Sequence, residues 1–526
     1  MAVAVMTDKI SEIKGSVLFA GKGVKIFEGF PYYYYELAEK PLDSKTERIR
    51  KTLVEVISRK SPLNDVAKAL EKNIPETGLT ALRLIIGKIE SEDLLDTLPT
   101  SEQMEKLEEE LSGFLQKHSS IENTEEIAER ILEESIGYGE LSPLVKDPEL
   151  EEIMVNSFES IFVFHRNFGM CKSNVKIAKP ENMTQLVKKI AKRVGKVFDT
   201  NNPLLDARLP DGNRANATFS YVTPFGMTLT IRKFKKEPLT VIDLIANGTL
   251  NAEIAAFLWA MVEGLEIEPM NIIVAGGTTS GKTTTLNCLA QFLRYRNRIV
   301  TIEDTLELQL GDRENWIRME ARLKSSDNKE VSMDDLLKNS LRMRPDRILV
   351  GEVRGSEAQT MFVAMDTGHK GLMGTLHANN AKETLIRLKS EPMAVPEAML
   401  PLLDLIVVQY RQYIRDKGLI RRVYQVTEVS RMNEQVLLSN IFEWDRNKDE
   451  IKKTDVPARV LETLSEKAGI TKKELMREIA VRQKILEWMF ENNISQQTEV
   501  EKIIQGYYYN PKYILEKIAE GISANI

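Results

Sequence analysis

The sequence predicts an α/β fold built on a largely parallel sheet, and two observations support this prediction. First, short apolar runs typical of buried strands alternate with helical stretches, as in parallel sheets that are covered on both faces. These runs lie at 272–275, 299–302, 348–350, 372–376 and 405–409. Second, a glycine-rich loop follows the first run and opens a helix, in the strand–loop–helix order of a phosphate-binding unit.

The glycine-rich loop has the spacing G-x-x-x-x-G-K-[ST]. Its residues are Gly276, Gly277, Thr278, Thr279, Ser280, Gly281, Lys282 and Thr283, followed by Thr284. In such a loop the backbone N–H groups surround phosphate, and the helix N-terminus adds positive potential. We expect Lys282 to reach the β and γ phosphates and the Thr283 hydroxyl to ligate Mg²⁺. The predicted ligand is therefore a nucleotide phosphate.

Length and composition limit the other classes of protein. The chain has 526 residues, with 72 Lys and Arg against 78 Asp and Glu and a formal net charge of −6. The length indicates about two to four domains, and the negative charge argues against a nucleic-acid partner. Cys171 and Cys288 lie far apart, which predicts a reducing compartment without disulfides. No apolar run is long enough to span a bilayer, so we expect a cytoplasmic protein that reaches the membrane only through a partner.

Changes in sequence pattern divide the chain into four parts. We expect the first to be variable and largely helical, the second to be an α/β domain, the third to hold the parallel sheet, and the fourth to be a helical C-terminal subdomain. Their predicted bounds are 1–122, 123–236, 237–444 and 445–526. The basic, proline-ended segment 233–238 is the predicted linker between the second and third parts.

Three local patterns add to this division. The tyrosines at 32–35 fit either the edge of a core or a docking patch. A β-hairpin is predicted at 217–231, with its turn at 224–226. Segment 471–474 has the form of a capping box, and the helix after it is predicted to pack through one apolar face. The predicted members of that face are Leu475, Ile479, Leu486, Met489 and Phe490.

Acidic residues follow two of the predicted strands. Glu303, Asp304 and Glu307 end the strand after the P-loop helix, and Glu352 ends the strand at 347–351. The carboxyl ends of parallel strands form the ligand-binding edge of such sheets. A carboxylate at this edge holds Mg²⁺ or polarises the attacking water. The alternative is a solvated strand end, since any buried strand can end in an acid.

Two of the four histidines, His369 and His377, bracket the predicted strand at 372–376. A histidine pair here can sense the γ-phosphate by hydrogen bonding or link subunits. A zinc site would need further ligands, which the neighbouring sequence does not offer. For His369, an ordinary loop position is an equal alternative.

Together, four segments resemble the Walker A, Asp, Walker B and His boxes of the type II/IV secretion ATPase superfamily. They are Gly276–Thr284, Thr301–Glu307, Arg344–Arg354 and Thr367–Asn379. Within this superfamily, three further segments look like the archaellum (archaeal flagellum) motor and assembly ATPase. They are 165–172, 202–212 and 507–511. The resemblance covers about residues 123–515.

The resemblance implies a RecA-like P-loop ATPase domain in a cytoplasmic homo-hexamer. The hexamer would be peripheral to the inner face of the cell membrane, docked on a polytopic membrane platform protein. In the archaellum branch, ATP-driven domain motions assemble pilin-like subunits and rotate the filament, with filament assembly or regulatory proteins as further partners. The four-cysteine zinc clip of many bacterial members is absent here, which implies a zinc-free archaeal branch, and Thr305 replaces the proline common in the Asp box.

The resemblance also assigns positions to the arginines. Arg208, Arg214 and Arg232 fall where the N-terminal domain of these ATPases presents arginines toward nucleotide, and the first two flank a turn at 209–213. A guanidinium there neutralises transition-state charge and couples hydrolysis to domain closure. An ordinary surface ion pair is the alternative for each of them.

The sequence thus predicts an enzyme that hydrolyses MgATP. Its predicted catalytic residues are Glu352, Glu303, Arg208, Arg214 and His377, and its predicted Mg²⁺ ligands are Thr283, Glu303, Asp304 and Glu352. Glu352 is predicted to polarise the water, with Glu303 supporting Mg²⁺ or sharing the base role. Three alternatives stay open: an ATPase of a non-rotating archaeal pilus or secretion system, a nucleotide-gated scaffold without turnover, and, disfavoured by charge, a DNA translocase.

Overall fold

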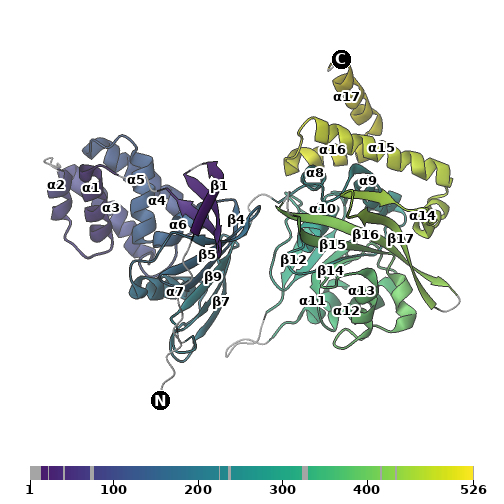
Figure 1. Cartoon of the computed structure of the whole chain (residues 1–526), viewed down its shortest axis with the longest axis horizontal. Helices are drawn as coiled ribbons and strands as arrows, with labels where there is room; N and C mark the ends of the chain where they lie inside the picture. The colour runs from purple at the N-terminus through teal and green to yellow at the C-terminus, as the bar shows by residue number, and fades with distance from the viewer. Residues whose placement is uncertain are drawn as a thin grey trace. The chain divides into compact units, whose positions relative to one another are not determined.

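The computed structural model describes residues 13–21, 23–38, 42–70, 76–223, 225–234, 238–322, 330–414, 418–432 and 435–524. Along the chain it divides into two compact units, Met1–Lys235 and Lys236–Ile526 (Figure 1). The division into four parts at the bounds expected from the sequence stays a prediction. Pro224 of the predicted hairpin turn and residues 235–237 of the predicted linker lie outside the described residues.

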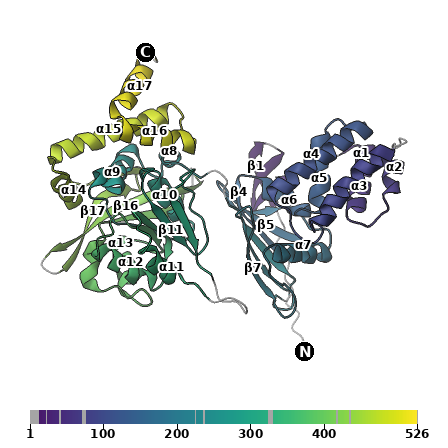
Figure 2. The ribbon, with the colours of Figure 1, turned by 180° about the vertical axis from the view of Figure 1, so that it is seen from behind.

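The first unit contains a bundle of helices that follows its first strands (Figure 2). The helices are α1 (Ser44–Ile57), α2 (Asn64–Leu70), α3 (Glu76–Ser91), α4 (Ser101–His118) and α5 (Thr124–Ser135). Side-chain caps fix where two of them begin: Asp43 accepts from the first-turn amides of α1, and Thr100 with Gln103 forms a capping box before α4. Apolar side chains at helical spacing, such as Leu53 and Leu111, are fully buried in a core of the bundle.

A sheet forms the other part of the first unit. Its order is β1-β2-β3-β6-β5-β4-β9-β8-β7, and its neighbours are antiparallel except for β3 and β6. The strands are β1 (Ile13–Gly21), β2 (Val24–Phe30), β3 (Tyr33–Leu37), β4 (Leu150–Ser157), β5 (Ser160–His165), β6 (Gly169–Ser173), β7 (Leu204–Arg208), β8 (Arg214–Thr218) and β9 (Thr228–Arg232). The helices α6 (Ser142–Lys146) and α7 (Pro180–Arg193) share its core. The predicted hairpin is present as β8 paired with β9.

The first strands differ from the helical region that the sequence led us to expect. Residues 13–37 form β1, β2 and β3, and β3 joins the sheet beside β6. The reason is local, because aromatic residues favour a pleated surface. Tyr34 and Tyr35 on β3 are buried, whereas Tyr32, just before the strand, stays exposed. Tyr35 donates a hydrogen bond to Asp147. The tyrosine cluster therefore lies at the edge of a core, with Tyr32 packed edge-on against Phe162.

The second unit is built on a sheet of order β12-β11-β13-β14-β10-β15-β16-β17-β18. Its parallel strands are β10 (Ile272–Gly276), β11 (Ile299–Glu303), β12 (Trp316–Glu320), β13 (Arg347–Val353), β14 (Met373–Leu376) and β15 (Leu405–Ile414). An antiparallel extension follows, made of β16 (Gly418–Met432), β17 (Gln435–Asp445) and β18 (Glu450–Lys453). The predicted parallel sheet is confirmed. The extension was missed, because short hairpin connections rather than crossover helices join its strands.

Helices cover both faces of this sheet. One face packs against α8 (Val241–Ala246), α9 (Ala252–Glu263) and α10 (Lys282–Ala290), and the other against α11 (Met333–Ser340), α12 (Glu357–Asp366) and α13 (Ala381–Lys389) (Figure 1). Alternate strand residues such as Val274 and Ala275 enter the two different cores. All five residues of β10 are buried, which explains its continuous apolar run.

The C-terminal helices share a core with the sheet. They are α14 (Arg459–Ala468), α15 (Lys472–Glu491), α16 (Gln497–Tyr509) and α17 (Pro511–Ala524). The capping box at Thr471 is confirmed. Of the predicted apolar face of α15, Phe490 is wrong: its side chain is 44% exposed, because one step past the buried Met489 turns it about 100° around the helix. Arg482 on this helix pairs with Glu263 of α9 at 3.0 Å, with both side chains buried.

Candidate nucleotide site

The glycine-rich loop connects β10 to α10 and has little room for side chains at two of its glycines. A Cβ on Gly276 would lie 2.5 Å from the backbone oxygen of Gln409, so the loop and β15 can approach this closely only with glycine. Gly281 has a φ of +97° and precedes the first residue of α10. The loop therefore brings backbone, rather than side chains, to the N-terminus of the helix, where a phosphate is stabilised.

Polar groups of the loop are arranged for an anionic ligand. The Lys282 ammonium donates to the carbonyl of Gly277 at 3.0 Å. Ser280 is 1% exposed, and its hydroxyl has no hydrogen-bond partner among the described residues. A buried polar atom without a partner is rare in a folded protein and needs an explanation. The residues present thus fit the phosphate chain that the spacing predicts.

Glu303 ends β11 and is buried. Its Oε2 accepts hydrogen bonds from the N–H groups of Glu307 and Leu308 at 2.6 and 2.9 Å, whereas Oε1 has no partner in the described part of the chain. Burial raises the pKa of Glu303 to about 7, although the two N–H donors oppose this rise. Near neutral pH this carboxyl can therefore either hold or give up a proton.

Glu352, on β13, is half-buried and ion-paired. Its Oε2 lies 2.6 Å from Arg354, whose guanidinium is also 3.7 Å from Asp304. Burial acts to raise the pKa of Glu352, but the hydrogen bond and charge of Arg354 and the charges of Lys282 and His377 outweigh it and lower the pKa. Glu352 is therefore ionised at neutral pH. Because β14 pairs in parallel with both β10 and β13, the loop lysine, this carboxylate and His377 lie at the same edge of the sheet.

His377 follows β14 at the same edge of the sheet. Its pKa is lowered by burial and by the charges of Lys282 and Arg387, so the ring is neutral at physiological pH. His369 lies before β14, at the other end of the strand, because β14 runs parallel to β10 and its carboxyl end meets the loop. The structure thus brings only one of the two histidines to the phosphate loop.

Sequence reasoning missed two residues that brace the loop. Gln409, 1% exposed at the end of the predicted strand run 405–409, accepts a hydrogen bond from Thr285 of α10 at 2.8 Å. Arg421, on β16, donates to the carbonyl of Thr279 at 3.1 Å. The buried polar end of an apolar strand was a signal for Gln409. Arg421 gave no signal, because its strand is distant in sequence and was not predicted.

In the first unit, strand register aligns the three predicted arginines. Arg208 lies opposite Arg214, and Arg214 lies opposite Arg232. Their neighbours along each strand, such as Ala207 and Ala215, are buried, so the three side chains emerge on the other face of the sheet. Like charges directly opposite one another are destabilising. On its other side Arg232 lies opposite Glu152 of β4, so the row of three arginines ends beside a carboxylate.

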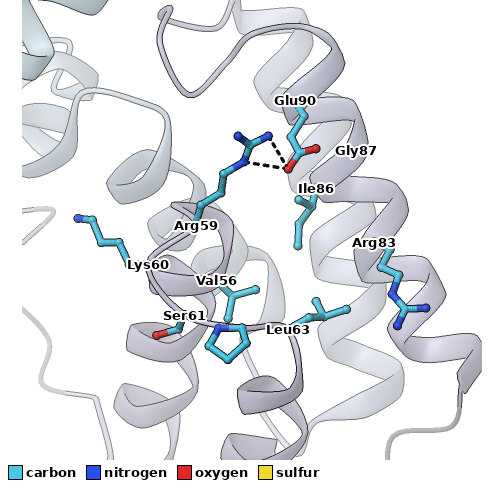
Figure 3. Close-up of a pocket in the computed structure, with 10 residues that line it drawn as sticks. Val56, Arg59, Lys60, Ser61, Leu63, Arg83, Ile86, Gly87 and Glu90 are labelled. Carbon is cyan, nitrogen blue, oxygen red and sulfur yellow. Dashed lines mark hydrogen bonds and ion pairs between the residues drawn. The ribbon is translucent and has the colours of Figure 1, made fainter.

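A groove of about 640 Å³ lies in the helical bundle of the first unit, between α1 and α3 (Figure 3). Its lining combines the apolar Val56 and Ile86 with the basic Arg59 and Arg83. The guanidinium of Arg59 forms an ion pair with Glu90 at 2.8 Å. None of the predicted site residues lines this groove, which is separate from the phosphate loop in sequence and in fold.

The comparisons with known proteins agree with the motifs. The family model described as Type II/IV secretion system protein matches residues 134–484. An uncharacterized protein of Methanocaldococcus jannaschii is 32% identical over 556 aligned positions, which cover 72% of this chain and 76% of that protein. A putative conjugal transfer protein of Mycobacterium tuberculosis is 31% identical over 269 positions, 50% of this chain and 75% of that protein. Among solved structures, the VirB11 ATPase of the Brucella suis type IV secretion system is 26% identical, with a TM-score of 0.29 over 55% of this chain and 92% of that one.

The family match covers more than half of the chain, so the chain belongs to the Type II/IV secretion system protein family. The predicted fold class, a RecA-like α/β ATPase domain with a second α/β domain and helical segments, is confirmed. The finer resemblance to the archaellum ATPase stays a prediction. Within the described ranges, no helix has both the length and the apolarity needed to cross a bilayer.

Proposed function

We propose that this member of the Type II/IV secretion system family hydrolyses MgATP and uses the energy to move one domain against another. The observation that carries the proposal is the convergence at one sheet edge of a phosphate loop, two acids with different protonation behaviour and a neutral histidine. Pairs of titratable groups whose environments separate their pKa values are typical of acid–base sites.

Different residues of the site would bind the phosphates and the Mg²⁺ ion. Gly276 to Thr284 would hold the phosphates, with Lys282 neutralising charge. Thr283, Asp304, Glu303 and Glu352 supply the hydroxyl and carboxylate oxygens that Mg²⁺ prefers, and the bound ion would neutralise charge on the phosphates. Arg354 keeps Asp304 and Glu352 near one another through its two ion pairs.

The two acids take different roles in this proposal. Glu303 has an oxygen without a partner in the described ranges and a pKa of about 7, which suits it to accept a proton from water. Glu352 is ionised and half-exposed, which suits it to orient the water and to support Mg²⁺. The sequence alone favoured Glu352 as the group that polarises the water, and the structure adds Glu303 as a proton acceptor. We therefore propose that Glu303 and Glu352 share the base role. The neutral His377 would donate a hydrogen bond to the γ-phosphate.

The arginine row of the first unit would complete the site. Arg208 and Arg214 are proposed to approach the nucleotide when the domains close, and Arg232 extends the row. A homo-hexameric ring is proposed from the family resemblance. In such a ring a neighbouring chain could supply these arginines, so specific activity would rise with protein concentration.

The finer proposal is a motor for an archaeal type IV pilus-like filament, the archaellum, docked in the cytoplasm on a polytopic membrane platform protein. It is supported by the archaellum-like segments at 165–172, 202–212 and 507–511. The similarity to a putative conjugal transfer protein favours export as the second candidate. Neighbouring genes for filament subunits and a polytopic membrane protein would support the first, and their replacement by conjugation genes the second.

A phosphate-release assay tests the core of the proposal. Purified protein with MgATP should release phosphate in single-turnover conditions, and Arg214→Ala should slow release at least tenfold while leaving nucleotide affinity within about threefold. The exposed Arg83→Ala in the helical bundle is a matched control. Nucleotide binding without turnover would instead support a nucleotide-gated scaffold, and stimulation by DNA would support a translocase.

A further inference from the structure

One residue of the phosphate loop has a backbone conformation that its side chain disfavours. Thr279 has a φ of +57°, in the left-handed region, where a β-branched residue is a genuine outlier. Such strained positions persist only where surrounding contacts hold them, and they concentrate at functional sites. Thr279 is exposed, so burial of its side chain does not account for the conformation.

Local bonds and one distant side chain act on Thr279. Its hydroxyl donates to the carbonyl of Thr278 at 2.7 Å, and the Ser280 N–H donates to the carbonyl of Gly277 at 3.3 Å across the turn. The distant contact comes from the antiparallel extension of the sheet. The Nε of Arg421, on β16, donates to the Thr279 carbonyl at 3.1 Å. The stem of the same side chain lies beside Gly281, because a Cβ added there would be 3.5 Å from Cδ of Arg421. Arg421 therefore bonds the loop at Thr279 and runs past it at Gly281.

The next residue of β16 fixes the place of this strand. Arg422 points to the other face and binds both carboxylate oxygens of Asp449, at 2.8 and 3.0 Å. It also donates to the carbonyl of Asn247 at 2.9 Å. Because Arg422 is buried and bonded on one face of the sheet, it fixes the backbone of β16 at this point. The neighbouring Arg421 side chain therefore starts from a fixed position on the other face.

We propose that Arg421 is a positioning residue that holds the phosphate loop in its nucleotide-receiving conformation by stabilising the left-handed Thr279. The inference rests on the proposed function, since it concerns the same nucleotide site. Arg421 acts on Thr279 and does not itself take part in the chemistry. Its removal should allow the loop to relax, and nucleotide binding must then restore the strained conformation at a cost in affinity.

A double-mutant cycle with nucleotide binding as readout tests this proposal. Arg421→Ala should raise the Kd for MgATP and MgADP about tenfold, with kcat at saturation within about twofold. In a Thr279→Gly background the same substitution should change Kd by less than about twofold, because glycine adopts positive φ without steric cost. Arg421→Lys should fall between, since lysine keeps a donor but lacks the planar guanidinium.

Three results would overturn the inference. The first is an equal loss of affinity from Arg421→Ala in both backgrounds, which would make Arg421 a simple charge for phosphate. The second is an unchanged Kd in Arg421→Ala, and the third is a loss confined to kcat. The exposed Arg83→Ala in the helical bundle of the first unit is the control and should bind as wild type does. If wild type itself binds no nucleotide, the proposed function fails and not this inference alone.

Discussion

At the amino edge of the parallel sheet, Asp404 accepts a hydrogen bond from Asn271, whereas at the carboxyl edge one oxygen of Glu303 has no partner among the residues that the structure describes. The backbone N–H of Asn271 donates to Asp404 at 2.7 Å. The Asn271 side chain bonds the backbone of Leu402 and Leu372, so this residue ties the starts of β10, β14 and β15 together. Burial raises the pKa of Asp404 to about 7, as it does for Glu303. A perturbed carboxyl is therefore not by itself a functional one; an unused hydrogen-bonding atom beside a ligand loop separates the two.

The largest effect should come from the loop lysine. Lys282→Ala should weaken binding of MgATP at least about 100-fold, because a charge-assisted contact to phosphate is lost. Equilibrium binding of a fluorescent ATP analogue measures this, with the exposed Lys338→Ala as the matched control. Wild-type affinity in Lys282→Ala would place the nucleotide elsewhere and remove the functional difference between the two edges.

The acids of the carboxyl edge should control turnover rather than binding. Glu303→Gln and Glu352→Gln should each lower the single-turnover rate about 100-fold while keeping ATP affinity within about threefold, the range expected for a lost acid–base group. Rapid-quench measurement of phosphate release checks this. Asp404→Asn at the amino edge is the control, and a comparable loss of turnover in this variant would contradict the functional difference between the two edges.

The two edges should behave alike when stability is measured against pH. The folded pKa of Asp404, about 7, exceeds its ordinary value of 3.8, so the protonated form is favoured by folding. In wild type, the stabilisation that protonated Asp404 contributes is fully present below about pH 4 and is lost as the pH rises to 7. Asparagine at this position does not titrate. Between pH 4 and pH 8 the free energy of unfolding of Asp404→Asn should therefore rise by about 3 kcal/mol relative to that of wild type.

The corresponding substitution at the carboxyl edge should show the same sign. Glu303 has a folded pKa of about 7 against an ordinary 4.5, so Glu303→Gln should gain a similar amount between about pH 4.5 and pH 8. Urea unfolding with a chelator present measures both variants. A pH-independent difference would show that these carboxyls are not perturbed by burial.

The smallest expected effect distinguishes the two histidines. His377→Ala should lower turnover about tenfold, because a neutral donor near the γ-phosphate is lost, whereas His369→Ala should leave it unchanged. Steady-state phosphate release at saturating MgATP gives the comparison. Equal losses in both variants would mean that His369 acts through a contact that a neighbouring subunit provides.

Sequence patterns anticipated the parallel sheet and most of the residues at its carboxyl edge. They succeeded because parallel strands connected by helices place every strand end after an apolar run on the same edge, so that Glu303, Glu352 and His377 could be selected by position alone. Applied to the histidines, the rule favours His377, which follows the strand, over His369, which precedes it.

The antiparallel parts were harder to foresee. The strands at residues 13–37 and the extension after β15 connect through short turns, and neither has the alternation of strand and helix that identifies a parallel sheet. The row formed by Arg208, Arg214 and Arg232 depends on register across three strands. A shift of one residue would send each side chain to the other face, so no single segment contains the information.

The sequence by itself determined the phosphate loop, its strand and helix and the order of the boxes, because these depend on neighbours within a few residues. Only the tertiary structure decided the pKa of Glu303, the pairing of Glu352 with Arg354 and the support of Thr279 by Arg421. Burial and electrostatic coupling arise from groups that are distant in the chain and adjacent in space. They exist only once the sheet has assembled.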